Sequence, residues 1–215
     1  MFSNLFIVEV FLKGGIVMVP LLLCSILALA VTIGRVRYFM ARPLDAENLM
    51  RNVKALLNSA DLQEAIRICR SEPHPLGLVI AAGLNHLGLA RQDMMDHMRE
   101  EALRQLKNIV RHNSILSTIA GISPLLGLTG TIMGMISSFS VISTVGIGDP
   151  TALAGGISQA LYTTATGLFV GIPALIVYNW CENKVIQYED AVEYCSLDLA
   201  NNLPSREYER EKASS

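Results

Sequence analysis

Residues 113–180 read NSILSTIAGISPLLGLTGTIMGMISSFSVISTVGIGDPTALAGGISQALYTTATGLFVGIPALIVYNW. From His112 to Cys181 the one formal charge is Asp149. An ionised side chain at the centre of a membrane-spanning helix costs roughly 2.5–3.5 kcal/mol on insertion scales, so a long charge-free run marks membrane. The breaker cluster GIGDP around Asp149 predicts a turn. We therefore predict a helical hairpin, with spans at 112–145 and 153–180 and a turn at 146–152.

A shorter charge-free run extends from Gly14 to Gly34. It has about the 20 residues that cross a hydrocarbon core of roughly 30 Å, so we predict a first span at residues 14–34. Basic residues follow this span and also precede the hairpin, and Lys and Arg are enriched on the cytoplasmic side of membrane proteins. Residues 35–111 are therefore predicted to be a cytoplasmic helical segment. This orientation makes residues 1–13 and the turn periplasmic, and it makes residues 181–215 a cytoplasmic C-terminal helix and tail.

The overall composition agrees with a membrane protein and excludes several other classes. Hydrophobic residues make up 51% of the 215 residues and charged residues 17%, and the mean hydropathy is +0.40. A net charge of −2 leaves no basic stripe for nucleic acid. The four cysteines are scattered, without disulfide or metal-site spacing. No phosphate loop, HExxH or GxSxG motif is present, so we expect no enzyme, no metal and no cofactor.

The segment between the first two spans carries apolar residues at helical spacing. Leu49 and Val53 belong to one such set, and Ala65, Ile66 and Cys69 to another. The apolar residues 76–89 are too few to span a membrane and predict a packed helix. No breaker separates Met94 from the second span, so one continuous helix is expected there. The predicted fold is an all-α membrane protein with three transmembrane helices, a helical cytoplasmic domain, and long second and third helices that extend into the cytoplasm.

Small residues recur every three or four positions in both halves of the hairpin. Small residues let helix backbones approach closely in lipid, where no hydrophobic force drives association. Two faces on the third span suggest neighbours on both sides, as in a ring of subunits, and packing of one span on the other is the alternative. The predicted packing residues are Gly127, Gly130 and Gly134 in the second span and Gly156, Ala160, Gly167 and Gly171 in the third.

Apart from His112 at the very start of the second, the three predicted spans contain no Asp, Glu, Lys, Arg or His. Their polar groups are hydroxyls, which often bond to carbonyls one turn back, and the amide of Gln159. That amide has four hydrogen-bonding valences that lipid cannot satisfy, so Gln159 is expected to face protein or a water-filled passage. A proton relay through this chain must therefore take a carboxylate from another chain.

Three sequence blocks carry a family resemblance: SPLLGLTGTIMG (123–134), GGISQALYTTATGL (155–168) and GIPAL (171–175). They resemble the MotA/TolQ/ExbB proton channel family, and the short cytoplasmic segment is more similar to ExbB or TolQ than to flagellar stators. The resemblance implies a homopentamer in the bacterial cell inner membrane. Its ring would surround two helices of an ExbD- or TolR-like single-span partner that supplies an intramembrane Asp, and a TonB- or TolA-like protein would carry work to the outer membrane.

The resemblance also assigns roles within the spans. Thr131 and Thr164 match pore-lining threonines of the family, and Pro124 and Pro173 match prolines that shape the helices. Gln159 stands where ExbB and TolQ proteins carry a glutamate. Together with these threonines and Thr163, it is predicted to line the ion pathway.

Two further readings compete with a proton-driven motor. A passive scaffold that has lost conduction along with the glutamate is one of them. The other is a motor that is driven by sodium or that serves gliding or flagellar-type rotation, because hydroxyl and amide oxygens are also sodium ligands.

Overall fold

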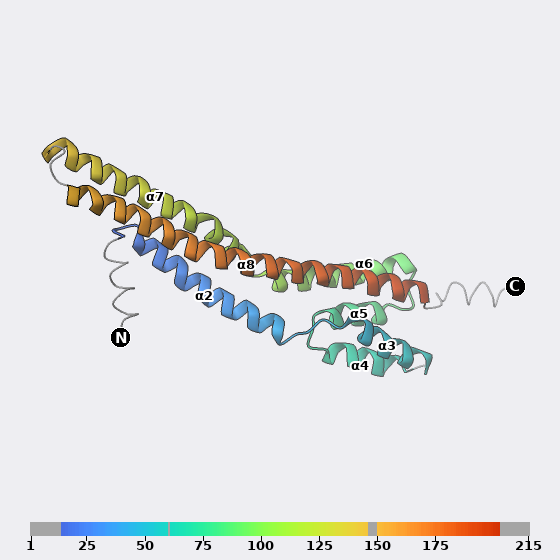
Figure 1. Cartoon of the computed structure of the whole chain (residues 1–215). Helices are drawn as coiled ribbons and strands as arrows, with labels where there is room; N and C mark the ends of the chain where they lie inside the picture. Colours follow the sequence, from blue (N-terminus) through green and yellow to red (C-terminus); the bar gives the residue numbers. More distant parts are fainter. Residues whose placement is uncertain (1–13, 60, 146–149, 203–215) are drawn as a thin grey trace, which may run out of the picture. The chain divides into compact units, whose positions relative to one another are not determined.

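The computed structural model describes residues 14–59, 61–145 and 150–202, and helices are its regular elements throughout these ranges (Figure 1). Their bounds are α2 Met18–Met40, α3 Ala46–Asn58, α4 Leu62–Ser71, α5 Leu76–Asn85, α6 Arg91–Val110, α7 Asn113–Val145 and α8 Pro150–Asn202. Three of them are long and apolar enough to cross a membrane: α2, α7 and α8 from Ala154 onward. The prediction of an all-α fold with three spanning helices is confirmed.

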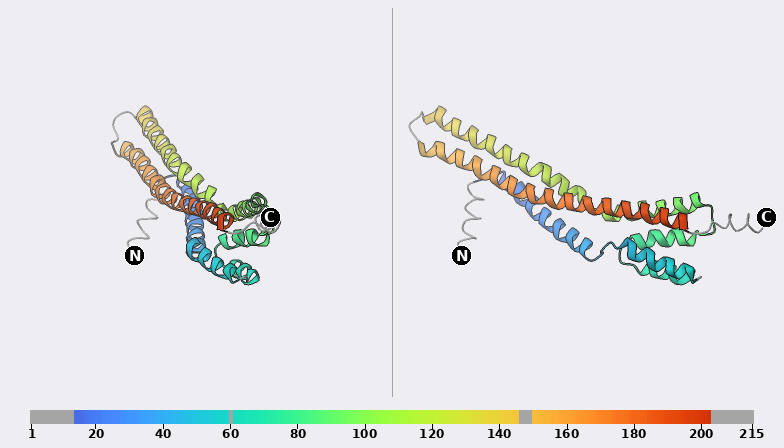
Figure 2. Two further views of the ribbon diagram at one scale, coloured as in Figure 1. Left: turned by 90° about the vertical axis from the view of Figure 1, so that its right-hand side faces the viewer. Right: turned by 45° about the vertical axis from the view of Figure 1, so that its right-hand side comes forward.

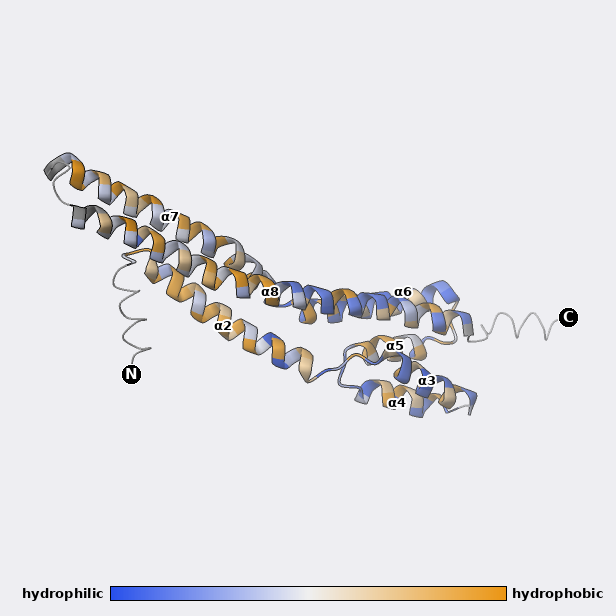
Figure 3. Ribbon diagram, viewed as in Figure 1, coloured by the Kyte–Doolittle hydropathy of each residue, from blue (hydrophilic) through white to orange (hydrophobic). Residues whose placement is uncertain are grey.

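The chain divides into two compact units. The spanning unit combines residues up to Arg35 with residues 112–180, and the helical unit combines residues 36–111 with the chain from Cys181 onward. Figure 3 shows that hydrophobic residues dominate α2, α7 and the first part of α8, whereas hydrophilic residues dominate α6 and the last part of α8. This division follows from the distribution of charge along the sequence.

In the spanning unit, α7 and the first part of α8 run side by side as a hairpin (Figure 2). The third helix, α2, contacts this hairpin through two small apolar clusters. Leu21 of α2 packs near Leu126, and Ala28 packs with Ile119 and Ala174. The predicted periplasmic segment 1–13, most of the turn at 146–152 and the tail after residue 202 lie outside the described residues.

The expected continuous helix from Met94 into the second span is wrong. Helix α6 ends at Val110 and α7 begins at Asn113. Between them, Arg111 has an extended backbone and His112 has φ +70°. No Gly or Pro marks this break, but His and Asn enter the left-handed region several times more often than most residues. The pair His112-Asn113 was therefore the signal available in the sequence.

Helix α8 has 53 residues, far more than the roughly 20 that cross a bilayer. A long third helix that continues past its span was predicted, and one helix runs from Pro150 to Asn202. At 1.5 Å per residue it is about 80 Å long. Its last part therefore extends beyond a membrane and joins the helical unit.

The helical unit forms where the spacing of apolar residues predicts it. Asp45 and Asp61 accept hydrogen bonds from backbone amides at the starts of α3 and α4, and such caps stabilise helix ends by about 1 kcal/mol each. Val53, Cys69 and Val79 are fully buried in the common core. The core is completed by residues of α6 and by Tyr188 from the last part of α8.

A buried histidine makes this unit sensitive to acid. Burial, with a smaller contribution from Arg42, lowers the pKa of His74 from 6.5 to about 4. The neutral ring accepts a hydrogen bond from the Leu76 amide at Nδ1, 3.2 Å away. The unfolded chain binds this proton more readily than the folded chain does between pH 6.5 and 4. The stabilisation is therefore complete above about pH 6.5 and is lost as the pH falls towards 4.

We expect the free energy of unfolding to decrease between pH 6.5 and 4 by more in the unmodified protein than in a His74→Gln variant. Thermal unfolding of both proteins in detergent, followed by circular dichroism across this range, measures the difference. Other titrating groups cancel in the comparison. Parallel curves for the two proteins would show that His74 does not contribute.

Candidate ion pathway in the spanning unit

Glycines bring the backbones of α7 and α8 together along the hairpin. A methyl group at Gly134 would lie 2.6 Å from the carbonyl oxygen of Gly156, and one at Gly167 would lie 2.5 Å from that of Ser123. At Gly130 it would overlap the side chain of Thr163. Gly127 faces α8, and Gly171 and the buried Ala160 face α7, in the same way. Both small-residue faces of the third span thus contact α7 of the same chain, so they no longer argue for neighbouring subunits.

Thr131 and Thr164 meet across this contact. Their hydroxyl groups are hydrogen-bonded to each other. The Thr131 hydroxyl also lies 3.3 Å from the carbonyl oxygens of Gly127 and Ala160, and the Thr164 hydroxyl lies 3.3 Å from that of Gly127. Two hydroxyls and two carbonyls therefore form an uncharged oxygen cluster, in which both threonines are half-buried.

Thr163 has a different environment from its neighbour Thr164. Its side chain is fully buried in the single chain and packs on Gly130. Its hydroxyl donates to the carbonyls of Gln159 and Ala160, 3.1 and 3.0 Å away. Thr163 therefore shares the Ala160 carbonyl with the oxygen cluster from a buried position, and its role in an ion pathway stays a prediction.

Gln159 lies one turn before Thr163, and its half-buried side chain is held against the start of α2. A methyl group at Gly15 would overlap the amide nitrogen of Gln159, and Gly15 has φ +69°. Both facts require glycine at residue 15, since L side chains rarely adopt this conformation. We did not predict a role for Gly15, and the pair Gly14-Gly15 at the start of the first span was the only signal for it.

The two prolines shape the hairpin at different places. Pro124 lies inside α7, where a methyl group at Gly171 would be 3.0 Å from its ring. Proline removes one backbone hydrogen bond from a helix interior, and in a membrane a neighbouring helix has to compensate. Pro173 lies inside α8 and is exposed in the single chain.

Chemically, the oxygen cluster can coordinate a cation or relay a proton, but it has no acidic or basic group that could bind and release one. Residues 14–34, 113–145 and 150–180 hold no acidic or basic side chain. Hydroxyl and carbonyl oxygens can pass a proton through bound water or partly replace the hydration shell of a cation. A step that takes up and releases a proton needs an ionisable group from another chain.

Three helices of this chain are long and apolar, and the oxygen cluster lies between two of them, α7 and α8. These features define an integral membrane protein. The sequence profile of the MotA/TolQ/ExbB proton channel family matches residues 71–193, which is more than half of the chain. The chain belongs to this family, whose members are channel and transport proteins rather than enzymes.

Several curated proteins are similar over most of the chain. The biopolymer transport ExbB-like protein 1 of Synechocystis is 36% identical over 179 residues, which cover 80% of this chain and 69% of that protein. The ExbB-like protein 3 of the same organism is 33% identical over 173 residues, covering 78% and 81%. TolQ of Pseudomonas aeruginosa is 30% identical over 154 residues, covering 61% and 67%. The predicted resemblance to ExbB and TolQ is confirmed.

Proposed function

We propose that this protein is the ion-pathway subunit of a motor complex of the ExbB/TolQ type, driven by the proton motive force. One observation carries the proposal. The oxygen cluster of Thr131 and Thr164 lies between two helical stretches, residues 113–145 and 150–180, that hold no acidic or basic side chain. It is therefore suited to pass an ion and unsuited to bind and release a proton alone. Movement of one charge across 100 mV releases about 2.3 kcal/mol, so a few ions suffice to rearrange a weak interface.

The titrating group would come from an ExbD- or TolR-like partner with one span and an intramembrane aspartate. In this proposal a homo-oligomer, a pentamer by the family resemblance, surrounds the partner's helices in the bacterial inner membrane. The N-terminus is periplasmic and the C-terminus cytoplasmic. A TonB- or TolA-like protein then transmits the work to outer-membrane transport or envelope maintenance.

Within this complex, we assign the ion pathway to Thr131 and Thr164, with Gln159 and Thr163 as further predicted members. Gln159 is neutral where relatives carry an acid, so it would offer hydrogen bonds without a charge. Its contact with Gly15 supports a second role, which is to fix the first span against the third. Gly127, Gly130 and Gly134 would keep the pathway narrow by holding α8 close to α7.

The neutral amide of Gln159 also favours a second candidate function, a scaffold that binds partner helices without conducting. A sodium-driven motor is a variant of the first proposal, because the hydroxyl and carbonyl oxygens of the oxygen cluster can also ligate sodium. Sodium and potassium buffers distinguish a sodium-driven motor from a proton-driven one.

Reconstitution in vesicles with a pH gradient and an internal pH dye tests the proposal. We expect the chain alone to pass no protons, and the chain together with its single-span partner to pass them. Replacement of the partner's intramembrane Asp by Asn should abolish flux while the complex still forms. A stable two-chain complex that conducts neither protons nor sodium would support the scaffold. Motor-like proton flux through the chain alone would contradict both functions.

A further inference from the structure

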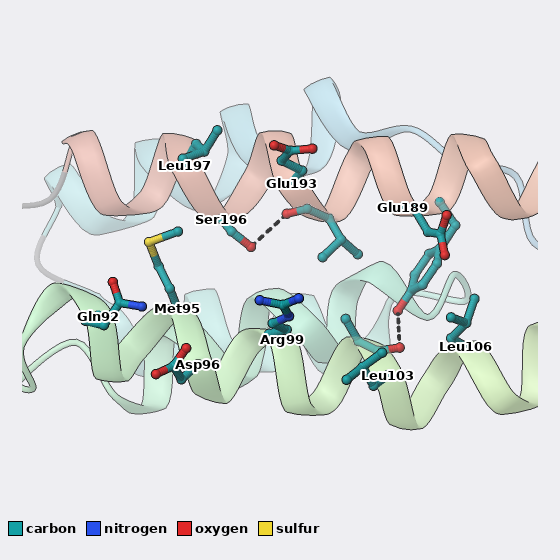
Figure 4. Close-up of a pocket in the computed structure, with 13 residues that line it drawn as sticks. Gln92, Met95, Asp96, Arg99, Leu103, Leu106, Glu189, Glu193, Ser196 and Leu197 are labelled. Atoms are coloured by element: carbon teal, nitrogen blue, oxygen red, sulfur yellow. Dashed lines mark hydrogen bonds between the residues drawn. The ribbon is translucent and has the colours of Figure 1, made fainter.

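A groove lies between α6 and the last part of α8 in the helical unit (Figure 4). Its volume is about 510 Å³, and its lining on α6 extends from Gln92 to Leu106. Fifteen helical residues span about 21 Å, so the groove is about four turns long. The Tyr188 hydroxyl donates to the carbonyl of Ala102 at 3.2 Å and holds the two helices together along one side.

Large apolar side chains along this groove are left exposed. Leu103 is 55% exposed and Leu197 is 40% exposed, and both line the groove together with Leu106 and Val192. A helix face that only contacts water usually carries polar residues at such positions. An apolar strip with polar edges is typical of a surface that binds an amphipathic helix. The volume provides room for the side chains of one helix face.

The charges on the groove are unbalanced. Asp96, Glu189 and Glu193 line it together with a single base, Arg99, and all four side chains are exposed. None of the four forms a salt bridge within the part of the chain that the structure describes. In the close-up, Arg99 projects from α6 towards α8, and Glu189 and Glu193 project from α8 (Figure 4). Three carboxylates against one guanidinium favour a basic occupant.

We propose that the α6–α8 groove binds a basic amphipathic helix of a partner chain. The apolar face of that helix would cover Leu103 and Leu197, and its Lys or Arg residues would pair with the three carboxylates. Complementary charge of this kind sets specificity and association rate more than affinity.

Positive charge is the expected property of such a segment, because the cytoplasmic flanks of membrane spans are rich in Lys and Arg. A single-span partner carries one flank of this kind. The choice of this partner as the source of the basic helix rests on the proposed function. The test of the groove measures binding and not ion flux, so the two proposals can fail separately.

The test uses the full chain in nanodiscs of zwitterionic phosphatidylcholine and two fluorescent 14-residue peptides. One peptide is an amphipathic helix of Leu and Lys, and the other has the same pattern with Glu in place of Lys. Fluorescence anisotropy measures both dissociation constants. We expect saturable binding of the Leu/Lys peptide and at least roughly tenfold weaker binding of the Leu/Glu peptide.

Variants then locate the binding site. Glu189→Gln with Glu193→Gln should weaken binding of the Leu/Lys peptide by roughly fivefold, as two exposed ion pairs are lost. Arg99→Glu should strengthen it, because the change removes the repelling charge. The control of equal charge is Asp93→Asn with Asp190→Asn, which removes two carboxylates from α6 and α8 outside the groove lining and should leave binding unchanged.

Three results would overturn the inference: equal effects of the groove and control variants, preference for the Leu/Glu peptide, or no effect of Arg99→Glu. A photo-cross-linker at residue 103 in cells identifies the occupant independently. A product of this chain with a different, basic chain supports the proposal. A product at twice the chain mass of 23.4 kDa would assign the groove to a second copy and contradict it.

Discussion

Replacement of both Thr131 and Thr164 by Val is expected to reduce ion flux through the reconstituted two-chain complex at least roughly tenfold. Val keeps nearly the volume of Thr but removes both hydroxyls, leaving the carbonyls of Gly127 and Ala160 without these donors. Each hydrogen bond contributes about 1 kcal/mol in such settings, and the loss of two corresponds to that factor or more. The pH dye assay described above measures the rate.

Two controls separate a pathway role from a structural one. Thr129→Val changes a threonine two residues from Thr131 whose exposed hydroxyl bonds to Leu125 in its own helix, and flux should persist. Thr131→Ser with Thr164→Ser keeps both hydroxyls and should retain most of the flux. Undiminished flux in the double Val variant would remove these threonines from the pathway.

The positions of the three spans were predictable because the cost of burying a charge is a local property of the sequence. The charge-free runs therefore coincide with apolar parts of α2, α7 and the first part of α8. The helical unit was also predictable, since Val53 and Cys69 belong to regular apolar patterns and are fully buried. The continuation of the third helix past its span was predictable as well, since no Gly or Pro interrupts the chain between Trp180 and Asn202. The break between α6 and α7 was not, because no Gly or Pro marks it.

Long-range contacts limited the prediction of the candidate site. The small residues of the two spans were recognised, but a periodic pattern does not say which helix a face meets. Contact of Gln159 with Gly15 joins residues far apart in the sequence, and the left-handed conformation of Gly15 is invisible to periodicity. The different environments of the two neighbours likewise depend on how α8 is rotated against α7, since Thr163 is buried against Gly130 and Thr164 bonds to Thr131.

Gly130→Leu is expected to have the largest effect on stability. A Cβ at this position would overlap the Thr163 side chain, and a Cβ at Gly127, three residues earlier, would lie 3.0 Å from the Thr163 carbonyl oxygen. The helices would have to separate, which costs about 3 kcal/mol or more, because overpacking of a tight contact reaches this size. The fraction of folded protein during SDS titration of detergent-solubilised protein, followed by circular dichroism, measures the loss.

The control for this substitution is Gly121→Leu, on the same helix, where a Cβ meets nothing within 4 Å. It should leave the folded chain intact. Gly130→Ala should be destabilising as a single change, and Gly130→Ala combined with Thr163→Gly should recover most of the stability, because the overlapping atoms are removed. Recovery would identify a direct contact between these two residues. If Gly121→Leu is as damaging as Gly130→Leu, helix propensity or lipid contact governs these glycines, and close packing of α7 on α8 does not explain the small-residue pattern.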